Sequence, residues 1–344
     1  MSVINIIKSI INRIHSFLSP PSCQFKSSIF LKDIFLHPRL LFLRLMRVSV
    51  KFSNFSPNLI IKKIDIGEKK KIKIDSNNFS KEDLIRTGSE ILNKYGIVII
   101  ENAFDAKIVN DFLEVSNKYT DIPKNNYKPE ENIPYANQIL NKIPLIKDKF
   151  VLSDIITKTI DLSCGNNNQE FAYVRQFPLV TKFVPTDENT KSNWTSGWHV
   201  DFPTQITAAV LLEDLKPNCT RMQALPYSKF LPLIPGKHYD ISPSINSVDF
   251  KDKIIDIYGP KGTLYIHSGN TLHRNFPVSG CNRYIWGSTY TFDKLFFLGE
   301  KNYRNEFFKN SEDLLESLSS SDLKRIDGLL NAPYSARKKQ LSYI

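Results

Sequence analysis

The stretch SGWHVDFPTQITAAVLLEDL, Ser196 to Leu215, joins a pair of polar residues to a long apolar run. Its second half is rich in β-branched and aliphatic residues and follows a proline, which is typical of a buried strand. His199 and Asp201 precede that run. Because residues two apart in a strand point to the same face, an imidazole and a carboxylate can converge here. Taken alone, the pair fits either a metal site or the polar start of an ordinary strand.

More strand-like segments surround this stretch, and turns containing Pro, Gly or Asn separate them. Many short strands with such turns favour a sandwich or a jelly roll. We therefore predict a mainly β fold with flanking helices, built on a double-stranded β-helix (jelly roll, cupin-like) core. The segments are FAYVRQFPLVTKFV (171–184), RMQALPY (221–227), KIIDIYG (253–259), GTLYIHS (262–268) and NRYIWGSTYTF (282–292).

Helical signals flank the β region on both sides. Residues 80–96 predict a helix that Ser80 and Asp83 cap and Gly96 ends. A strand at 70–75 is expected before it, a buried strand at 97–104 after it, and a second helix at 105–119. Residues 121–150 are rich in Pro and Asn and predict an irregular loop. Helices return at 311–318 and 319–330.

The chain of 344 residues is 41% hydrophobic and 24% charged, which fits a folded protein and excludes a disordered one. Its net charge is +11. Residues 1–51 hold eight basic residues and one acidic residue, a balance of 8 − 1 = +7, so the rest carries 11 − 7 = +4. The near-neutral body gives no reason to expect nucleic-acid binding. We predict a basic N-terminal extension (1–51), a double-stranded β-helix domain with a helical preface (52–300) and a helical tail (301–344).

Apolar residues at helical spacing in 3–18 predict an amphipathic helix in the extension. Such a helix can lie on an anionic membrane surface, or it can pack on the main domain or a partner. The sequence has no apolar run long enough to cross a bilayer and no compact secretion signal. Its cysteines, at 23, 164, 219 and 281, are scattered, so neither a zinc cluster nor a disulfide framework is predicted. We expect a reducing, cytoplasmic setting, with peripheral membrane contact through 1–51 as a further hypothesis.

A third metal ligand must come from elsewhere in the chain. His238 lies in a turn-rich polar stretch and is expected at the surface. His267 and His273 flank the turn in YIHSGNTLHRNF, after a strand that can pair beside the first. Two histidines and one carboxylate form the facial triad of non-haem Fe(II) oxygenases. Arg283, ten residues past His273, can bind a carboxylate at two points.

The sequence resembles the phytanoyl-CoA dioxygenase family of Fe(II)/2-oxoglutarate-dependent oxygenases over roughly 90–295. The similar segments are LNKYGIVIIENAFDAKIVNDFLEVS (92–116), GWHVDF (197–202), LLEDLKPNCTRMQALPYSK (211–229) and GTLYIHSGNTLHRNFPVSGCNRY (262–284). In the family pattern the second histidine of the last segment is the ligand. The resemblance therefore implies His273 and gives His267 a supporting or packing role.

The resemblance also implies a site and a reaction. Fe(II) would be held by His199, Asp201 and His273, and 2-oxoglutarate by Arg283, with Gln176 and Asn275 nearby. The enzyme would use O2, with ascorbate as a reductant, to hydroxylate a small organic or acyl substrate and release succinate and CO2. An aspartate in the ligand set favours hydroxylation over halogenation. The residues expected along the substrate pocket are Trp198, Phe202, Gln205 and Trp286.

The chain departs from the family pattern at Cys219, Thr220, Tyr227 and Lys229, in loops expected to border the substrate. Two other hypotheses remain beside the oxygenase. One is a cupin-like module that binds a divalent metal without oxygenase activity. The other is a membrane-associated protein in which residues 1–51 are the functional element.

Overall fold

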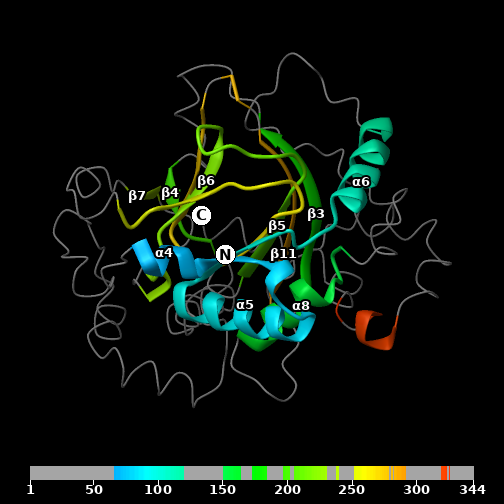
Figure 1. Cartoon of the computed structure of the whole chain (residues 1–344), viewed down its shortest axis with the longest axis horizontal. Helices are drawn as coiled ribbons and strands as arrows, with labels where there is room; N and C mark the ends of the chain where they lie inside the picture. Colours follow the sequence, from blue (N-terminus) through cyan, green and yellow to red (C-terminus); the bar gives the residue numbers. More distant parts are fainter. Residues whose placement is uncertain are drawn as a thin grey trace, which may run out of the picture.

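The computed structural model describes residues 66–119, 150–163, 173–183, 197–201, 205–230, 238–239, 252–278, 280–281, 283–291, 319–323 and 325. Figure 1 shows how their helices and strands are arranged. The predicted extension at 1–51, nearly all of the polar loop at 121–150 and most of the C-terminal tail lie outside these residues.

Two sheets make up the β core. The larger has the strand order β1-β2-β9-β5-β11-β3, and the smaller has the order β7-β4-β10-β6-β8. Neighbouring strands are antiparallel except β1 and β2, which are parallel. The strands are β1 Lys73–Asp75, β2 Ile97–Glu101, β3 Tyr173–Phe183, β4 Trp198–His199, β5 Gln205–Leu211, β6 Arg221–Ala224, β7 His238–Tyr239, β8 Ile255–Ile257, β9 Leu264–Ser268, β10 His273–Phe276 and β11 Arg283–Thr291.

The chain passes back and forth between the sheets. It runs from β4 in the smaller sheet to β5 in the larger and back to β6, and then from β8 through β9 and β10 to β11 with a change of sheet at each step. This alternation is the double-stranded β-helix, or jelly roll, so the predicted fold class is confirmed.

The larger sheet has two unlike faces. In β5, Ile206 and Ala208 are buried on the outer face, whereas Gln205 and Thr207 are half-buried on the other face. We call this second face the inner face, because its side chains contact residues of the smaller sheet, as described below.

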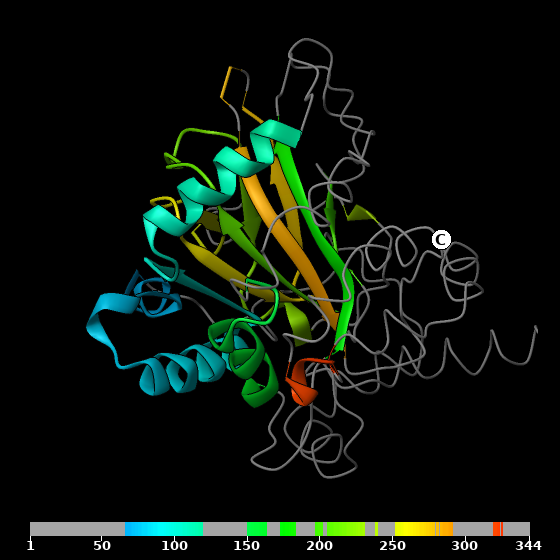
Figure 2. The ribbon, with the colours of Figure 1, turned by 90° about the vertical axis from the view of Figure 1, so that its right-hand side faces the viewer.

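Helices cover the outer face of the larger sheet. They are α4 Ile66–Ile72, α5 Lys81–Tyr95, α6 Ala106–Tyr119 and α8 Asp154–Ser163, and 3-10 turns lie at η3 Ser76–Asn78 and η5 Ser228–Phe230. Gly88 brings α5 close to Thr159 of α8 and to Ile100 of β2. Figures 1 and 2 show α5 and α8 side by side. Between helices and sheet, the ring of Phe150 stacks on Phe104 at 4.6 Å.

The predicted helix at 80–96 is confirmed with both of its ends. The Asp83 amide donates to Ser80 Oγ at 3.2 Å, and Gly96 ends α5 in the left-handed region with φ of 79°. The expected strand at 70–75 is partly wrong, because 70–72 complete α4 and only 73–75 pair with β2. Ile72 is fully buried as the last residue of α4.

A short part of the C-terminal segment is described and contacts the helical layer. Residues 320–323 are helical, and the Arg325 guanidinium makes two hydrogen bonds to the Asp161 carboxylate of α8, at 3.1 and 2.5 Å. Among the described helices, none combines the length and apolar character needed to cross a membrane.

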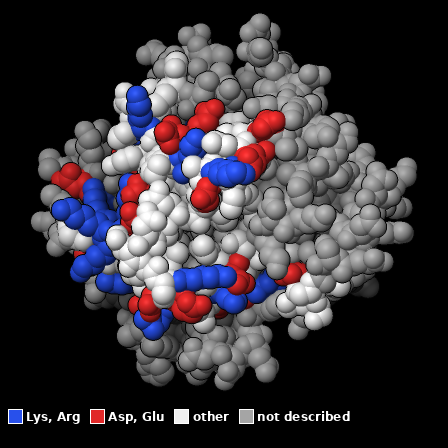
Figure 3. Space-filling model, turned by 45° about the vertical axis from the view of Figure 1, so that its right-hand side comes forward, with Lys and Arg blue, Asp and Glu red and all other residues white. Residues whose placement is uncertain are grey.

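Charges on the described surface are largely of mixed sign. In Figure 3, basic and acidic side chains lie close together in several places on the described part of the face shown. Several form ion pairs, such as Lys73 with Glu101 at 2.7 Å and Lys81 with Asp154 at 2.7 Å. Exposed pairs such as Lys81 with Asp154 contribute about 0–1 kcal/mol each, so they keep the surface charge balanced more than they stabilise the fold.

Candidate metal site

The two candidate histidine ligands come from neighbouring strands of the smaller sheet. β4 and β10 are antiparallel, and His199 is the direct partner of His273. Side chains at directly opposed positions lie on the same face of a sheet. The two imidazole rings are accordingly 4.4 Å apart between centroids.

Asp201 reaches the same place by a route that differs from the prediction. β4 ends at His199, so strand alternation does not extend to the aspartate. Its backbone is instead fixed on the turn between β9 and β10: the Asp201 amide donates to the Gly269 carbonyl at 2.7 Å, and the Gly269 amide donates to the Gln205 carbonyl at 2.6 Å. Gly269 thus holds both ends of the segment 201–205.

His199, Asp201 and His273 form a group whose ligand atoms all lie within 4.8 Å of one another. The Nδ1 atom of His199 is 2.8 Å from the Gly197 carbonyl, and that of His273 is 2.8 Å from the Thr271 carbonyl. These contacts assign the proton to Nδ1 and the lone pair to Nε2 in both rings. Metal-binding imidazoles are oriented in this way, so the residues present fit a divalent metal ion.

The surroundings of His273 also favour a neutral imidazole. Burial, together with the neighbouring His267, lowers the pKa of His273 to about 4. His273 Nε2 lies 3.7 Å from Asp201 Oδ2. Since the ring is neutral near pH 7, this contact is not an ion pair but an approach of two ligand atoms.

His267 occupies a different position from His273. It lies on the inner face of β9 in the larger sheet, fully buried, with its ring 4.5 Å from that of His273. Its Nδ1 is 3.2 Å from the Ser268 carbonyl, and burial lowers its pKa. It is not a member of the close ligand group and packs beside it.

Arg283 and Asn275 are joined across the two sheets. Asn275 follows His273 by two residues in β10 and so shares its face. Its Oδ1 accepts a hydrogen bond from Arg283 Nη2 of β11 at 2.6 Å. Arg283 is buried, and burial lowers its pKa, yet a guanidinium stays charged. Asn275 thus orients the arginine, and its contact with 2-oxoglutarate stays a prediction.

Two of the predicted pocket residues point away from this site. Trp198 lies on the face of β4 opposite His199, with the Arg274 guanidinium 4.8 Å from its ring. Trp286 lies on the outer face of β11 and packs on Phe150 at 5.7 Å. Neither ring faces the ligand group, because strand residues separated by an odd number of positions lie on opposite faces. Their place along the substrate pocket stays a prediction.

The structure places three of the four remaining residues that the sequence analysis singled out. Gln205 lies beside the ligand group and donates to Asp201 Oδ2 at 3.0 Å. The backbone of Gln176 pairs with Thr289 in the larger sheet. His238, expected in a turn, belongs to β7 and pairs with His199. Phe202 lies outside the described residues.

The loop at 225–229 contacts the end of α5 and the residue before β10. Tyr227 and Lys229 are buried, and Lys229 Nζ donates to the Asn93 carbonyl at the end of α5. Ser228 Oγ accepts from the Leu272 amide at 2.7 Å, one residue before His273. Tyr227 and Lys229 therefore pack against the end of α5, and a role for this loop beside the substrate stays a prediction.

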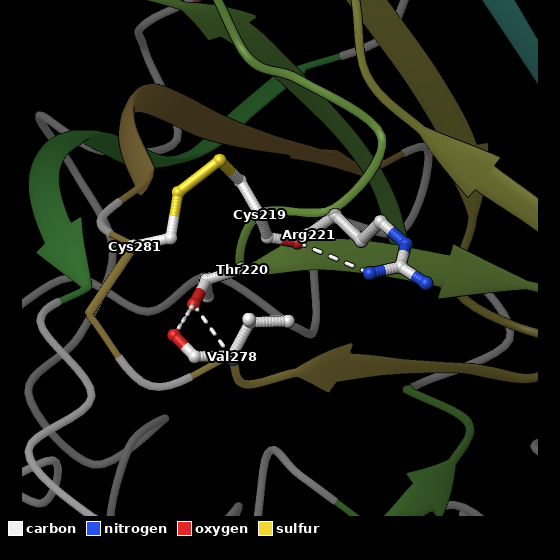
Figure 4. Close-up of a disulfide and its surroundings, with 5 residues drawn as sticks. All are labelled: Cys219, Thr220, Arg221, Val278 and Cys281. Carbon is white, nitrogen blue, oxygen red and sulfur yellow. Dashed lines mark hydrogen bonds between the residues drawn. A yellow bond between two sulfur atoms is a disulfide. The ribbon is translucent and has the colours of Figure 1, made fainter.

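The structure pairs two cysteines that the sequence left unpaired. Cys219 and Cys281 form a disulfide, which corrects the expectation of none (Figure 4). It joins the segment before β6 to the segment before β11. Beside it, Thr220 Oγ1 donates to the Val278 carbonyl at 3.1 Å and accepts from the Val278 amide at 2.9 Å (Figure 4).

Three supporting residues were not predicted from the sequence: Gly269, Thr207 and Thr271. Gly269 acts through its backbone, and its only sequence signal is its place in the turn between His267 and His273. Thr207 Oγ1 accepts from Gln205 Nε2 at 3.2 Å, and its spacing of two from Gln205 was the signal available. Thr271 Oγ1 donates to the Gly96 carbonyl at 2.7 Å, a contact between residues 175 positions apart in the sequence.

No protein-family model matches the chain, and no curated protein matches it. Among solved structures, it is similar to EctD from S. alaskensis with 2-oxoglutarate and 5-hydroxyectoine, at 15% identity and a TM-score of 0.43 over 59% of this chain and 74% of that one. It is also similar to GIG2 (DUF1479) from Candida albicans, at 13% identity and a TM-score of 0.44 over 92% and 87% of the two chains. A third is AviO1 from Streptomyces viridochromogenes Tue57, at 11% identity and a TM-score of 0.39 over 60% and 94%. At these values the likenesses decide nothing about function.

Proposed function

We propose that this protein is an Fe(II)- and 2-oxoglutarate-dependent dioxygenase that hydroxylates a small organic or acyl substrate. The observation that carries the proposal is the close group of His199, Asp201 and His273, with ligand atoms within 4.8 Å and both imidazoles held through Nδ1. This donor set matches the facial triad of non-haem Fe(II) oxygenases.

Arg283 supports the choice of co-substrate. It is a buried guanidinium that Asn275 orients from the strand carrying His273. A guanidinium can bind a carboxylate through two parallel hydrogen bonds, which suits the distal carboxylate of 2-oxoglutarate. The segments that resemble the phytanoyl-CoA dioxygenase family contain Arg283 and all three candidate metal ligands.

When bound, Fe(II) and 2-oxoglutarate would supply the oxidising chemistry. One oxygen atom of O2 would enter succinate, as CO2 is lost from 2-oxoglutarate, and the other would enter the hydroxylated product. The chain's own residues do three things: His199, Asp201 and His273 offer three ligand atoms, Arg283 binds a carboxylate, and burial keeps the His273 imidazole neutral.

The test is succinate release by the purified full-length chain with Fe(II), 2-oxoglutarate, ascorbate and a panel of small-molecule substrates. We expect release above background, and loss of at least about 100-fold in His199→Ala and Asp201→Ala, since each removes a ligand. Asp111→Ala is the control, because it removes an exposed carboxylate of α6 that pairs only with Lys107 among the contacts described.

Metal binding by a folded protein that releases no succinate with any substrate would favour the cupin-like metal-binding module instead. Equal succinate release by the two ligand variants and the wild type would overturn the proposed site.

A further inference from the structure

We propose that Gln205 is a positioning residue that sets the orientation of the Asp201 carboxylate toward the metal. The inference rests on the proposed function, because it concerns the same ligand group. The sequence suggested that Gln205 lies against the substrate, and the structure supports a different role.

The contact is specific in its atoms. Gln205 Nε2 donates to Asp201 Oδ2 at 3.0 Å, and Oδ2 is the oxygen that lies 3.7 Å from His273 Nε2. The same Nε2 is 3.2 Å from Thr207 Oγ1. A primary amide has two N–H donors, so both contacts can form together. A carboxylate only accepts, which fixes the amide with its nitrogen toward Asp201.

The backbone gives Gln205 this reach. The Gln205 carbonyl accepts from the Gly269 amide, and the Gly269 carbonyl accepts from the Asp201 amide. The backbones of Gln205 and Asp201 are therefore both hydrogen-bonded to the same residue. Gln205 and Thr207 are two apart in β5 and therefore share the inner face. Thr207 is paired with His267 of β9, so the residue that accepts from the Gln205 side-chain amide is held in the sheet.

The chemistry of an amide suits the position. A lysine or arginine here would bind the carboxylate more strongly, but it would place a second positive charge beside the metal ion. A neutral amide orients the carboxylate without that repulsion and does not titrate. Carboxylate ligands that are hydrogen-bonded in this way bind metal about 10–100-fold more tightly than those that are not.

The test uses Gln205→Met, which keeps the length of the side chain and removes its donor. Co(II) is titrated into metal-free full-length protein, and its dissociation constant, its visible absorption spectrum and the protein's Tm are recorded. We expect Co(II) binding to weaken about 10–100-fold and the absorption bands to shift, with little change in the Tm of the metal-free protein.

Gln223→Met is the matched control. Gln223 is also a strand glutamine with two hydrogen bonds, to Asp256 at 2.7 Å and from Arg274 at 2.9 Å, but Arg274 places it on the far face of the smaller sheet from His273. Its variant should keep the wild-type Co(II) affinity and spectrum. If Gln205→Met fails to fold, Thr207→Val replaces it, with a smaller loss of affinity expected.

The outcomes separate the two proposals. Wild-type Co(II) affinity and spectrum in the Gln205 variant, with binding lost in His199→Ala, would overturn the positioning role alone. No Co(II) binding by the wild type, or binding that His199→Ala leaves unchanged, would overturn the proposed metal site itself.

Discussion

Gly96 is the residue where the helical layer meets the turn that leads to a metal ligand. It ends α5 with φ of 79°, a conformation that glycine adopts at little cost. Its carbonyl accepts two hydrogen bonds from the turn, one from the Ser268 amide at 2.9 Å and one from Thr271 Oγ1 at 2.7 Å. A side chain at this position would collide with the Thr271 hydroxyl.

Gly96→Ala should therefore cost more than a left-handed alanine alone. We expect about 1–2 kcal/mol from the backbone conformation and a further loss from the collision, measured as the free energy of unfolding in urea. Gly280→Ala is the control, since Gly280 has φ of 74° and a methyl group added there would meet no atom within 4 Å among the described residues. Equal losses in the two variants would show that contact with Thr271 contributes nothing.

For single residues, the local sequence predicted some structural roles and not others. Gly96 was predictable as a helix end because Ser80 and the apolar spacing define α5. The residue types of His199, Asp201 and His273 indicated a metal site, and the structure brings those three together. The hydrogen bond from Gln205 to Asp201 was not predictable, because it depends on backbone hydrogen bonds from both residues to Gly269, which is 64 or more positions away in the sequence.

At the scale of elements, the segment before β6 and the segment before β11 are covalently linked and hydrogen-bonded to each other. The Cys219–Cys281 disulfide and the Thr220–Val278 hydrogen bonds hold them together just before Arg283. The residues around each cysteine do not indicate this pairing. The two cysteines are 62 positions apart in the sequence, so only the fold brings them together. The two-residue strands β4 and β7 were also not predictable from the sequence, because each is defined only by its pairing with a strand elsewhere in the chain.

Removal of this disulfide should destabilise the fold. For a loop of this size the entropy of the unfolded chain predicts a loss of about 4 kcal/mol in Cys219→Ser/Cys281→Ser, measured by urea unfolding without reductant. Dithiothreitol should lower the stability of the wild type and leave the double variant unchanged. Thiol alkylation that labels Cys219 and Cys281 in the folded, untreated protein would contradict the pairing.

At the scale of the whole molecule, the jelly roll separates two environments. Polar residues of the two sheets meet between them: Gln205 and Arg283 lie on the inner face of the larger sheet, and His273 and Asn275 belong to the smaller sheet. The outer face of the larger sheet meets the helices and carries large buried side chains such as Trp286 and Tyr290. The sequence predicted the β class from its many short strands, but not which face each aromatic residue occupies, because a face depends on the register between strands.

Buried tyrosines make this helix–sheet core sensitive to high pH. Tyr290 is fully buried, and its hydroxyl donates to the Val151 carbonyl at 2.6 Å. Burial raises its pKa, and burial also raises the pKa of Tyr284 to about 12. A folded-state pKa above the unfolded value of about 10 means that stability is fully present below pH 10 and is lost as pH rises beyond it.

We therefore expect the free energy of unfolding to fall by up to about 1.4 kcal/mol per pH unit for each such tyrosine between about pH 10 and pH 12. Tyr290→Phe should lower the free energy of unfolding by about 1 kcal/mol at pH 8, because the variant lacks the hydrogen bond to Val151. Above pH 10 its free energy of unfolding should fall less steeply than that of the wild type. Urea unfolding at a series of pH values measures both effects. Tyr258→Phe is the control, because Tyr258 is only half-buried beside Lys73, and its variant should follow the wild-type decline. A decline as steep in Tyr290→Phe as in the wild type would show that ionisation of Tyr290 does not drive alkaline unfolding.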